Sequence, residues 1–327
     1  MAYTPLMRIL ITGGAGFIGS HLSERLVSDG HHVVAIDNFS TGSASNLDSL
    51  KGSEDFTLIE GSILDTNTLI PLIQEADYVF HLAAAVGVFN IVNHPLDSLM
   101  TNIRGTENVL EAANASNTPV FLTSSSEVYG KNVSDSLKES DDRILGSPVT
   151  LRWSYSEAKA IDESLAYAYF VEKNLEIRIV RFFNTVGPRQ LGAYGMVVPR
   201  FVLAALRDEP ITIYGDGRQT RCFAHVYDVV DAVIALAFVE NTVGKVINVG
   251  NDFEISINGL AQKIIAETGS KSEIVYVPYK EAYGDGFEDM ERRVPNIELI
   301  NQLVGWKPKR DLATIISDIS AEIKRNT

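Results

Sequence analysis

The chain has 327 residues but only one cysteine, Cys222. An intrachain disulfide is therefore impossible, and the composition fits a reducing, cytoplasmic compartment. The sequence also lacks any run of about 18 apolar residues, so we expect no membrane-spanning helix. The N-terminus does not show the basic segment, apolar run and small-residue cleavage site of a secretory leader, and we expect no signal peptide.

Basic residues are in deficit as well. Lys and Arg total 28 against 42 Asp and Glu, which gives a formal net charge of -14. Because nucleic acids and anionic membranes bind basic surfaces, neither is expected as a partner, and an anionic ligand must be held by a few placed arginines. The six histidines show no metal-ligand spacing, and no G-x-S-x-G elbow occurs. We therefore expect neither a metal site nor a serine hydrolase.

The first half of the sequence alternates short apolar segments with longer helical patterns. This order is typical of a parallel sheet that helices cover on both faces. The predicted strands are Arg8–Thr12, His32–Ile36, Phe56–Ile59, Tyr78–Leu82, Val120–Ser124 and Glu176–Phe182. The predicted helices are Gly16–Asp29, Thr66–Glu75, Asn102–Ala115 and Tyr155–Lys173.

The second half is richer in Gly and Pro after Asn184. It predicts a strand at Ile211–Tyr214, a helix at Asp228–Val239 and a strand at Val246–Val249 that rejoins the sheet. The expected fold class is α/β, a Rossmann-type doubly wound parallel sheet with a smaller α+β substrate-binding lobe. We assign residues 1–184 and 228–250 to the main sheet domain, and residues 185–227 and 251–327 to the smaller lobe.

A glycine-rich segment joins the first strand to the first helix. Gly13, Gly16 and Gly19 have the spacing G-x-x-G-x-x-G. Glycines at such positions allow a tight turn and a close approach of the backbone to a pyrophosphate, and the helix N-terminus offers N–H groups to the phosphates. The segment predicts a dinucleotide site, with a plain turn as the alternative.

Asp37 ends the second strand, 18 residues after Gly19. A carboxylate there accepts hydrogen bonds from the adenine ribose hydroxyls and repels a 2′-phosphate, which favours NAD over NADP as the cofactor. Asn38 is expected to assist. The alternative is that Asp37 only caps its loop.

Tyr155 and Lys159 are four residues apart at the start of a predicted helix, so they share one helix face. An ammonium group beside a phenol lowers the phenol's pKa from about 10 toward working pH, which suits a base that takes a proton from a carbinol. The strand that precedes them in the sequence ends near Ser125, whose hydroxyl can orient the reacting oxygen. A solvated helix face is the alternative for the Tyr/Lys pair.

At this point the sequence resembles the extended short-chain dehydrogenases/reductases, and among them the nucleotide-sugar epimerases, dehydratases and decarboxylases. The resemblance runs from residue 9 to about residue 308 and rests on a series of motifs in family order. These motifs are ILITGGAGFIGSHL, HLAA, TNIRGTENVLEAA, TSSSEVYG, YSEAK, RFFNTVGPR, ITIYGDGRQTRCF, VINVG and GWKP.

The resemblance implies a role for each matching position. The implied catalytic residues are Ser125, Glu127, Tyr155 and Lys159. The implied NAD-binding residues are Gly13, Gly16, Phe17, Ile18, Gly19, Asp37, Asn38, Ser62, Ile63, Leu82, Ala83, Ala84 and Asn102, with Tyr155 and Lys159. The implied UDP-sugar contacts are Ser126, Asn184, Arg189, Tyr214, Gln219, Arg221 and Arg293. Ser62 is a departure, since many relatives have Asp at this adenine contact.

The residues after Ser125 bear on the reaction. Dehydratases of the family usually carry Asp-Glu there, whereas this chain has Ser126-Glu127 and so lacks the acid; plain 4-epimerases mostly lack the glutamate. The arrangement is similar to that of UDP-glucuronate decarboxylases, as is the segment Arg152–Ser156. A 4-keto uronate is a β-keto acid that loses carbon dioxide readily, so the enzyme must mainly oxidise C4 and manage a proton at C5.

Several alternatives stay open. The segment Val86–Asn90 lacks the Cys-Pro-containing stretch that is usual in decarboxylases of the family. A UDP-sugar 4-epimerase therefore stays as the second hypothesis. A non-catalytic dinucleotide-binding regulator on the same fold is disfavoured because both Tyr155 and Lys159 are present, and an NADPH ketone reductase because of Asp37. In similar proteins, helices equivalent to Asn102–Ala115 and Tyr155–Lys173 pair between subunits, so a homodimer is expected.

Overall fold

The computed structural model describes residues 6–87, 93–192, 196–283 and 290–326. Its centre is a seven-stranded sheet in the order β11-β6-β5-β4-β1-β2-β3, in which every pair of neighbours is parallel. The strands are β1 (Arg8–Thr12), β2 (His32–Asp37), β3 (Phe56–Glu60), β4 (Tyr78–His81), β5 (Val120–Ser125), β6 (Ile177–Phe182) and β11 (Val246–Val249). The strand order reverses between β1 and β4, which makes this the doubly wound sheet that the sequence predicted.

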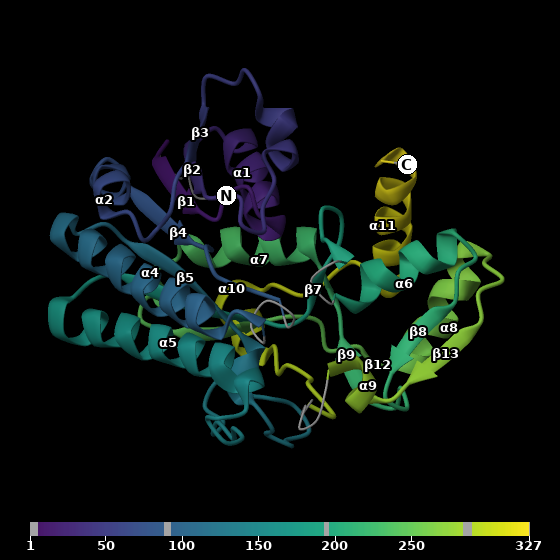
Figure 1. Cartoon of the computed structure of the whole chain (residues 1–327). Coiled ribbons are helices and arrows are strands. Elements are labelled where there is room, and N and C mark those ends of the chain that lie inside the picture. Colours follow the sequence, from purple (N-terminus) through teal and green to yellow (C-terminus); the bar gives the residue numbers. More distant parts are fainter. Residues whose placement is uncertain (1–5, 88–92, 193–195, 284–289, 327) are drawn as a thin grey trace.

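Helices cover both faces of the sheet (Figure 1). On one face lie α1 (Phe17–Ser28), α7 (Val226–Ala237) and α10 (Glu298–Val304), and on the other α2 (Thr66–Gln74), α4 (Pro95–Ser116) and α5 (Ser154–Lys173). Successive residues of a strand point to opposite faces, so two covered faces require apolar residues at almost every strand position. No helix in the described ranges is long and apolar enough to cross a membrane.

The remaining elements form a smaller lobe beside the sheet. Its apolar core lies among α6 (Val197–Leu206), β8 (Ile211–Tyr214), α8 (Ile257–Thr268), β13 (Ile274–Val277) and α11 (Leu312–Asn326). Three strand pairs connect or build it: β7 (Thr185–Val186) with β10 (Ala224–His225), β9 (Thr220–Cys222) with β12 (Glu254–Ser256), and β8 with β13. The short helices are η1 (Ala44–Leu50), η2 (Ser126–Tyr129), η3 (Leu151–Trp153), η5 (Glu240–Thr242) and α9 (Tyr279–Tyr283).

The strand boundaries agree with the predicted ones to within a residue, but one helix is longer than expected. Helix α4 begins at Pro95 and not at Asn102. Proline is favoured in the first turn of a helix, since its missing N–H would have no partner there, whereas the polar residues that follow gave little apolar periodicity. Of the segment noted above for its departure from decarboxylases, residues 88–90 lie outside the described residues.

A buried ion pair attaches α5 to the sheet. The guanidinium of Arg181 on β6 donates through Nε to Glu163 Oε1 at 2.9 Å and through Nη2 to Oε2 at 2.7 Å. The hydroxyl of Ser124 on β5 donates to the same carboxylate at 2.5 Å. Arg181 is 7% exposed and Glu163 8%. Both carboxylate oxygens are thus used, and α5 is held where β5 and β6 end.

We predict that Glu163→Gln lowers the free energy of unfolding by about 3–5 kcal/mol, because it leaves the Arg181 charge buried without a counter-charge. Urea denaturation followed by circular dichroism measures the change. Glu172→Gln, an exposed carboxylate on the same helix, is the matched control and should change stability by less than about 0.5 kcal/mol. Equal effects of the two variants would contradict this account of the ion pair.

Candidate active site

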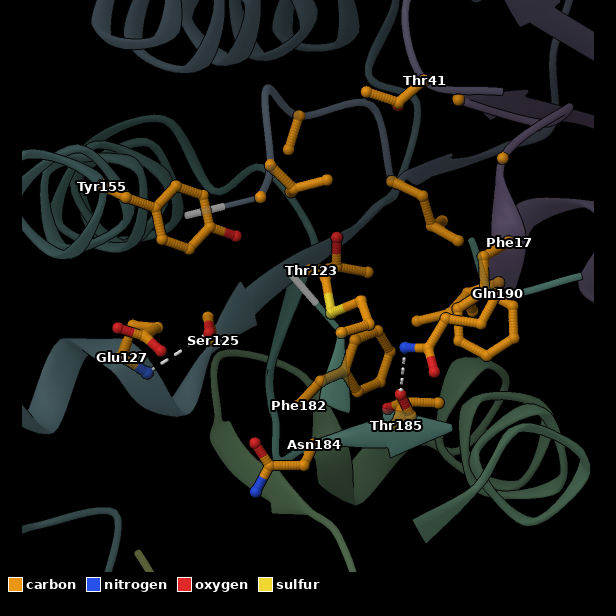
Figure 2. A pocket seen from close by; sticks show the side chains of 18 of the residues that line it. Phe17, Thr41, Thr123, Ser125, Glu127, Tyr155, Phe182, Asn184, Thr185 and Gln190 are labelled. Atoms are coloured by element: carbon orange, nitrogen blue, oxygen red, sulfur yellow. Dashed lines mark hydrogen bonds between the residues drawn. The ribbon is translucent and has the colours of Figure 1, made fainter. Parts of the chain in front are cut away.

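A cavity of about 490 Å³ opens at the carboxyl ends of the sheet strands, between the sheet and the smaller lobe. Ligands of doubly wound sheets bind at this edge, where the strand order reverses. Figure 2 shows side chains from both parts of the molecule facing the space, with Phe17 and Thr41 at one end and Glu127 at the other. The cavity lining contains residues of both predicted groups, those expected to bind the cofactor and those expected to bind the substrate, so the two groups share one site.

The glycine-rich segment forms one wall of this cavity. Gly13 has a positive φ of 71°, and a Cβ placed there would be 2.8 Å from the backbone nitrogen of Ala83. Gly16 is the N-cap of α1 and no side chain caps that end. The first N–H groups of α1 therefore remain available beside the cavity, which is the arrangement that binds phosphate. Any side chain at Gly13 would fill the turn that leaves them accessible.

Asp37 lies at the cavity wall and also holds its loop together. Its Oδ2 accepts a hydrogen bond from the Ala15 N–H at 2.9 Å, and its Oδ1 accepts one from Phe39 N–H at 2.8 Å. Burial raises the pKa of Asp37, although these N–H groups act in the opposite direction. The loop-capping alternative therefore describes part of what Asp37 does. Because Asp37 also lines the cavity, the predicted contact with the ribose stays a prediction for its second role.

The HLAA segment follows β4 and contributes Leu82, Ala83 and Ala84 to the lining. Asn102, predicted as a cofactor contact, lies behind this segment and not in the lining. Its Oδ1 accepts from Ala85 N–H at 2.8 Å and its Nδ2 donates to Ala85 O at 3.3 Å, and the residue is 1% exposed. The direct-contact prediction for Asn102 is therefore wrong: the amide pairs with the backbone and shapes the wall from behind.

Tyr155 lies in the first turn of α5 and points into the cavity, on the side where Ser125 ends β5 (Figure 2). Lys159 follows one turn later and is 2% exposed. Its Nζ donates to Thr123 O at 3.2 Å and to Asp162 Oδ2 at 3.1 Å. The three predicted catalytic groups Ser125, Tyr155 and Lys159 thus come together from β5 and α5.

The pKa of Tyr155 differs from the expectation. Burial raises it, Lys159 lowers it, and the carboxylates Glu127 and Asp162 raise it again, so that the pKa stays above its ordinary value. The prediction from the Tyr/Lys spacing was a lowered pKa. It failed because the spacing reveals neither the burial of the phenol nor the two carboxylates that approach it, Glu127 from η2 and Asp162 from two turns farther along α5.

Glu127 lies in η2 with its carboxylate between two arginines. Arg152 Nη1 is 2.7 Å from Oε2, and Arg293 Nη1 contacts Oε1. Burial would raise the pKa of Glu127, but the two guanidinium groups outweigh it and hold the pKa far below its usual range. The carboxylate is therefore ionised. The turn itself does not need the Glu127 side chain, since only the Glu127 backbone N–H takes part, donating to the side-chain Oγ of Ser125 (Figure 2).

Most of the predicted substrate residues also line the cavity. These residues are Ser126, Asn184, Tyr214, Gln219, Arg221 and Arg293. Asn184 is held between the two lobes, because its Oδ1 accepts from Arg293 and its Nδ2 donates to Cys222 O at 2.9 Å. Gln219 donates to Tyr279 Oη at 2.8 Å and to the Tyr214 carbonyl at 3.2 Å. A polar end of the cavity is thereby built from β8, β9 and α9.

Arg189 is not brought to the cavity, and its predicted substrate contact is corrected here. Its Nη2 donates to Glu24 at 2.6 Å and its backbone N–H to Glu322, with a positive φ of 69°. The Arg189 side chain thus lies against α1, and its backbone N–H lies against α11. A sequence motif predicts which residue follows the Gly-Pro turn but not the direction in which that turn sends its side chain.

Two cavity arginines were missed by the analysis of the sequence. Arg152 lies three residues before Tyr155, in a segment noted only because it resembles UDP-glucuronate decarboxylases. That resemblance was the signal that could have identified it. Arg200 lies in the first turn of α6, with its guanidinium 4.4 Å from the centre of the Tyr214 ring. Nothing in its local sequence distinguishes Arg200 from an exposed helix residue. Its role in the cavity wall depends on how α6 packs against β8.

Comparison with known proteins places this site in a family. Residues 10–319 match the model of the GDP-mannose 4,6 dehydratase family. The chain belongs to this family of extended short-chain dehydrogenases/reductases. A UDP-N-acetyl-alpha-D-glucosaminuronate decarboxylase of Bacillus cytotoxicus is 43% identical over 302 residues, or 92% of each chain. UDP-glucuronic acid decarboxylase 1 of Xenopus tropicalis is 39% identical over 92% of this chain and 68% of its own length.

Solved structures of the family have the same architecture. The crystal structure of UDP-glucuronic acid 4-epimerase from Bacillus cereus, in complex with UDP-glucuronic acid and NAD, superposes with a TM-score of 0.89 and is 30% identical. The alignment covers 98% of this chain and all of that one. The predicted fold class and family are therefore confirmed, and the relatives are nucleotide-sugar decarboxylases and epimerases.

Proposed function

We propose that this family member is an NAD-dependent decarboxylase of a UDP-hexuronate, with UDP-glucuronate as the leading substrate. The observation that carries the proposal is the Glu127 carboxylate between Arg152 and Arg293, at the end of the cavity that also holds Tyr155 and Ser125. The decarboxylases cited above are 43% and 39% identical, against 30% for the 4-epimerase. The 2-acetamido analogue of UDP-glucuronate is included because the 43% identical relative is named for it.

The cavity fits NAD at the end formed by α1 and β2. A Cβ at Gly13 would conflict with the Ala83 backbone in the cavity wall, the N-terminus of α1 has no side-chain cap, and Asp37 is suited to the ribose hydroxyls and unfavourable for a 2′-phosphate. When bound, the cofactor would accept a hydride from the sugar carbon and return it. In the proposed division of the chain, residues 1–184 and 228–250 bind NAD, and residues 185–227 and 251–327 bind the nucleotide sugar.

The groups at the other end of the cavity handle the proton of the C4 hydroxyl. In the proposed mechanism Tyr155 takes that proton and later returns it, while Ser125 hydrogen-bonds the same oxygen. Lys159, fixed by Thr123 O, supplies the positive charge that favours the phenolate. These three residues would serve a decarboxylase and an epimerase alike.

The charge of the Glu127 cluster favours a uronate. Two guanidinium groups and one ionised carboxylate leave one positive charge, which matches the carboxylate at C6 of the sugar. Oxidation at C4 makes this group part of a β-keto acid, so carbon dioxide leaves without a dedicated catalyst. Since the pKa of Glu127 is strongly lowered, its carboxylate is a weak base, and the residue is suited to position the substrate rather than to donate or accept a proton.

The arginines of the smaller lobe fit the diphosphate. Arg221 and Arg200 line the cavity from β9 and α6, and guanidinium groups match phosphate geometry. Gln219, Tyr214 and Tyr279 form the polar and aromatic end suited to the nucleobase. A UDP-sugar 4-epimerase is the second candidate, favoured by the structural similarity to the Bacillus cereus enzyme.

For the cofactor, we expect NAD to bind far more tightly than NADP and to be retained during purification, because the Asp37 carboxylate would repel a 2′-phosphate. Denaturing the purified protein and identifying the released nucleotide by mass spectrometry tests this. Recovery of mainly NADP would refute the assignment.

For the reaction, a proton-NMR time course with UDP-glucuronate, and in parallel with its 2-acetamido analogue, should show a UDP-pentose and release of carbon dioxide. Tyr155→Phe should reduce turnover by about 10²–10⁴-fold while the protein stays folded. Glu127→Gln should slow carbon dioxide release more than NADH formation, and Arg293→Ala should also weaken substrate binding. A C4-inverted sugar with its carbon skeleton intact would replace the decarboxylase by the epimerase.

For assembly, we propose a homodimer formed by α4 and α5, in the cytoplasm, which suits a chain whose single cysteine is buried. Helix α5 carries the exposed apolar residues Ile161, Tyr167 and Val171, which are 45%, 49% and 59% exposed. Ile161→Glu should yield a monomer in sedimentation velocity, since it places a charge in the proposed interface. Val133→Glu, at an 86% exposed site outside both helices, is the control. A wild-type monomer at micromolar concentration would disprove the assembly.

A further inference from the structure

The lysine of the site has a second buried partner that the proposed mechanism does not use. Asp162 follows Lys159 by three residues on α5, and its Oδ2 accepts a hydrogen bond from Lys159 Nζ at 3.1 Å. Asp162 is 1% exposed and Lys159 2%. The lysine thus has two acceptors, the carbonyl of Thr123 on the sheet and the Asp162 carboxylate on its own helix.

Asp162 has fewer partners than the neighbouring carboxylate of Glu163, which is fully paired as a structural group would be. Both oxygens of Glu163 are occupied by Arg181, and Ser124 donates to it as well. In Asp162, Oδ1 is buried and accepts no hydrogen bond of ordinary geometry from the described residues, and Thr106 is the one hydroxyl close enough to lower the pKa of Asp162, which burial raises. A buried carboxylate with an unsatisfied oxygen is unfavourable for folding. Its main interaction is therefore the one with Lys159.

We propose that Asp162 is a positioning residue for the reaction: it fixes the Lys159 ammonium beside the tyrosine and offsets part of its charge, and so sets the pH range in which Tyr155 acts as a base. In turnover this inference rests on the proposed function, because that function gives Tyr155 its role. The interaction itself involves only the side chains of Asp162 and Lys159.

The charges around Tyr155 support this assignment. From its own helix it is faced by Lys159, which lowers the pKa of the phenol, and by Asp162, which raises it. From η2 it is faced by Glu127, whose charge is already shared by Arg152 and Arg293.

Two further ionisable groups lie near the lysine, and neither adds an uncompensated charge that would act on Tyr155. His81 on β4 is near Lys159, but burial and the lysine charge lower its pKa to about 3, so that it is neutral. Glu163 is neutralised by Arg181. Of the carboxylates facing the tyrosine, Asp162 is then the one whose only ion-pair partner among the described residues is the lysine.

Asp162→Asn removes the negative charge and keeps a side chain of the same shape. The positive charge of Lys159 then acts on the phenol without the opposing charge of Asp162, so the pKa of Tyr155 should fall by about one unit. Carbon-13 NMR of protein labelled at tyrosine Cζ measures this titration directly, with Tyr155→Phe identifying the signal. Asp162→Glu keeps the charge and should titrate close to the wild type, and Glu172→Gln, ten residues farther along α5, is the control for loss of a helix carboxylate.

The activity should follow the titration. In Asp162→Asn the acid limb of the kcat profile should move to lower pH by about the same unit, and the plateau should fall several-fold, because a phenolate of lower pKa is a weaker base. An unchanged Tyr155 titration in Asp162→Asn overturns the proposal, as does an equal shift in Asp162→Glu. A shifted titration without any turnover of UDP-sugars would instead contradict the proposed function and leave the role of Asp162 standing. If Asp162→Asn does not fold, Asp162→Ser gives the same test.

Discussion

Helix α5 is held on the sheet by buried charges, and the geometry of the site depends on them. Glu163 pairs with Arg181 from β6, and one residue earlier Asp162 pairs with Lys159, whose ammonium also binds the carbonyl of Thr123 on β5. Each pair is neutral, so the helix can lie against the apolar sheet without an isolated charge. Tyr155, one turn before Lys159, is thereby directed into the cavity at a constant position relative to β5.

The cavity is lined mainly by positive charges, although the chain as a whole is acidic. The protein has a formal net charge of -14, yet Arg152, Arg200, Arg221 and Arg293 all line this cavity. Glu127 compensates only part of them. A positive cavity in an acidic molecule attracts anionic small molecules while the outer surface repels polyanions. This separation suits a ligand with a diphosphate and a carboxylate better than nucleic acid or a lipid surface.

The cavity exists because the chain crosses between its two parts several times. After β6 it enters the smaller lobe, returns through α7 and β11, and leaves again through β12 (Figure 1). Contacts such as Asn184 with Cys222 and Arg293 join segments that are far apart in sequence. Residues of the lobe are consequently fixed against residues of the sheet, and substrate groups held by one part can meet the reactive groups of the other.

The sequence by itself determined the sheet, the turn at Gly13 and the grouping of Ser125, Tyr155 and Lys159. These features follow from local patterns, namely apolar strands, glycine spacing and an i, i+4 pair on a helix, together with the rule that parallel strands end at one edge. Tertiary structure decided the rest. Arg189 points away from the cavity and Arg200 points into its wall, Asn102 supports the wall from behind, and burial together with the carboxylates of Glu127 and Asp162 raises the pKa of Tyr155. Each of these outcomes depends on which charged groups from distant segments meet in a buried space, where the interaction of charges is strong, and no spacing along the chain specifies such a meeting.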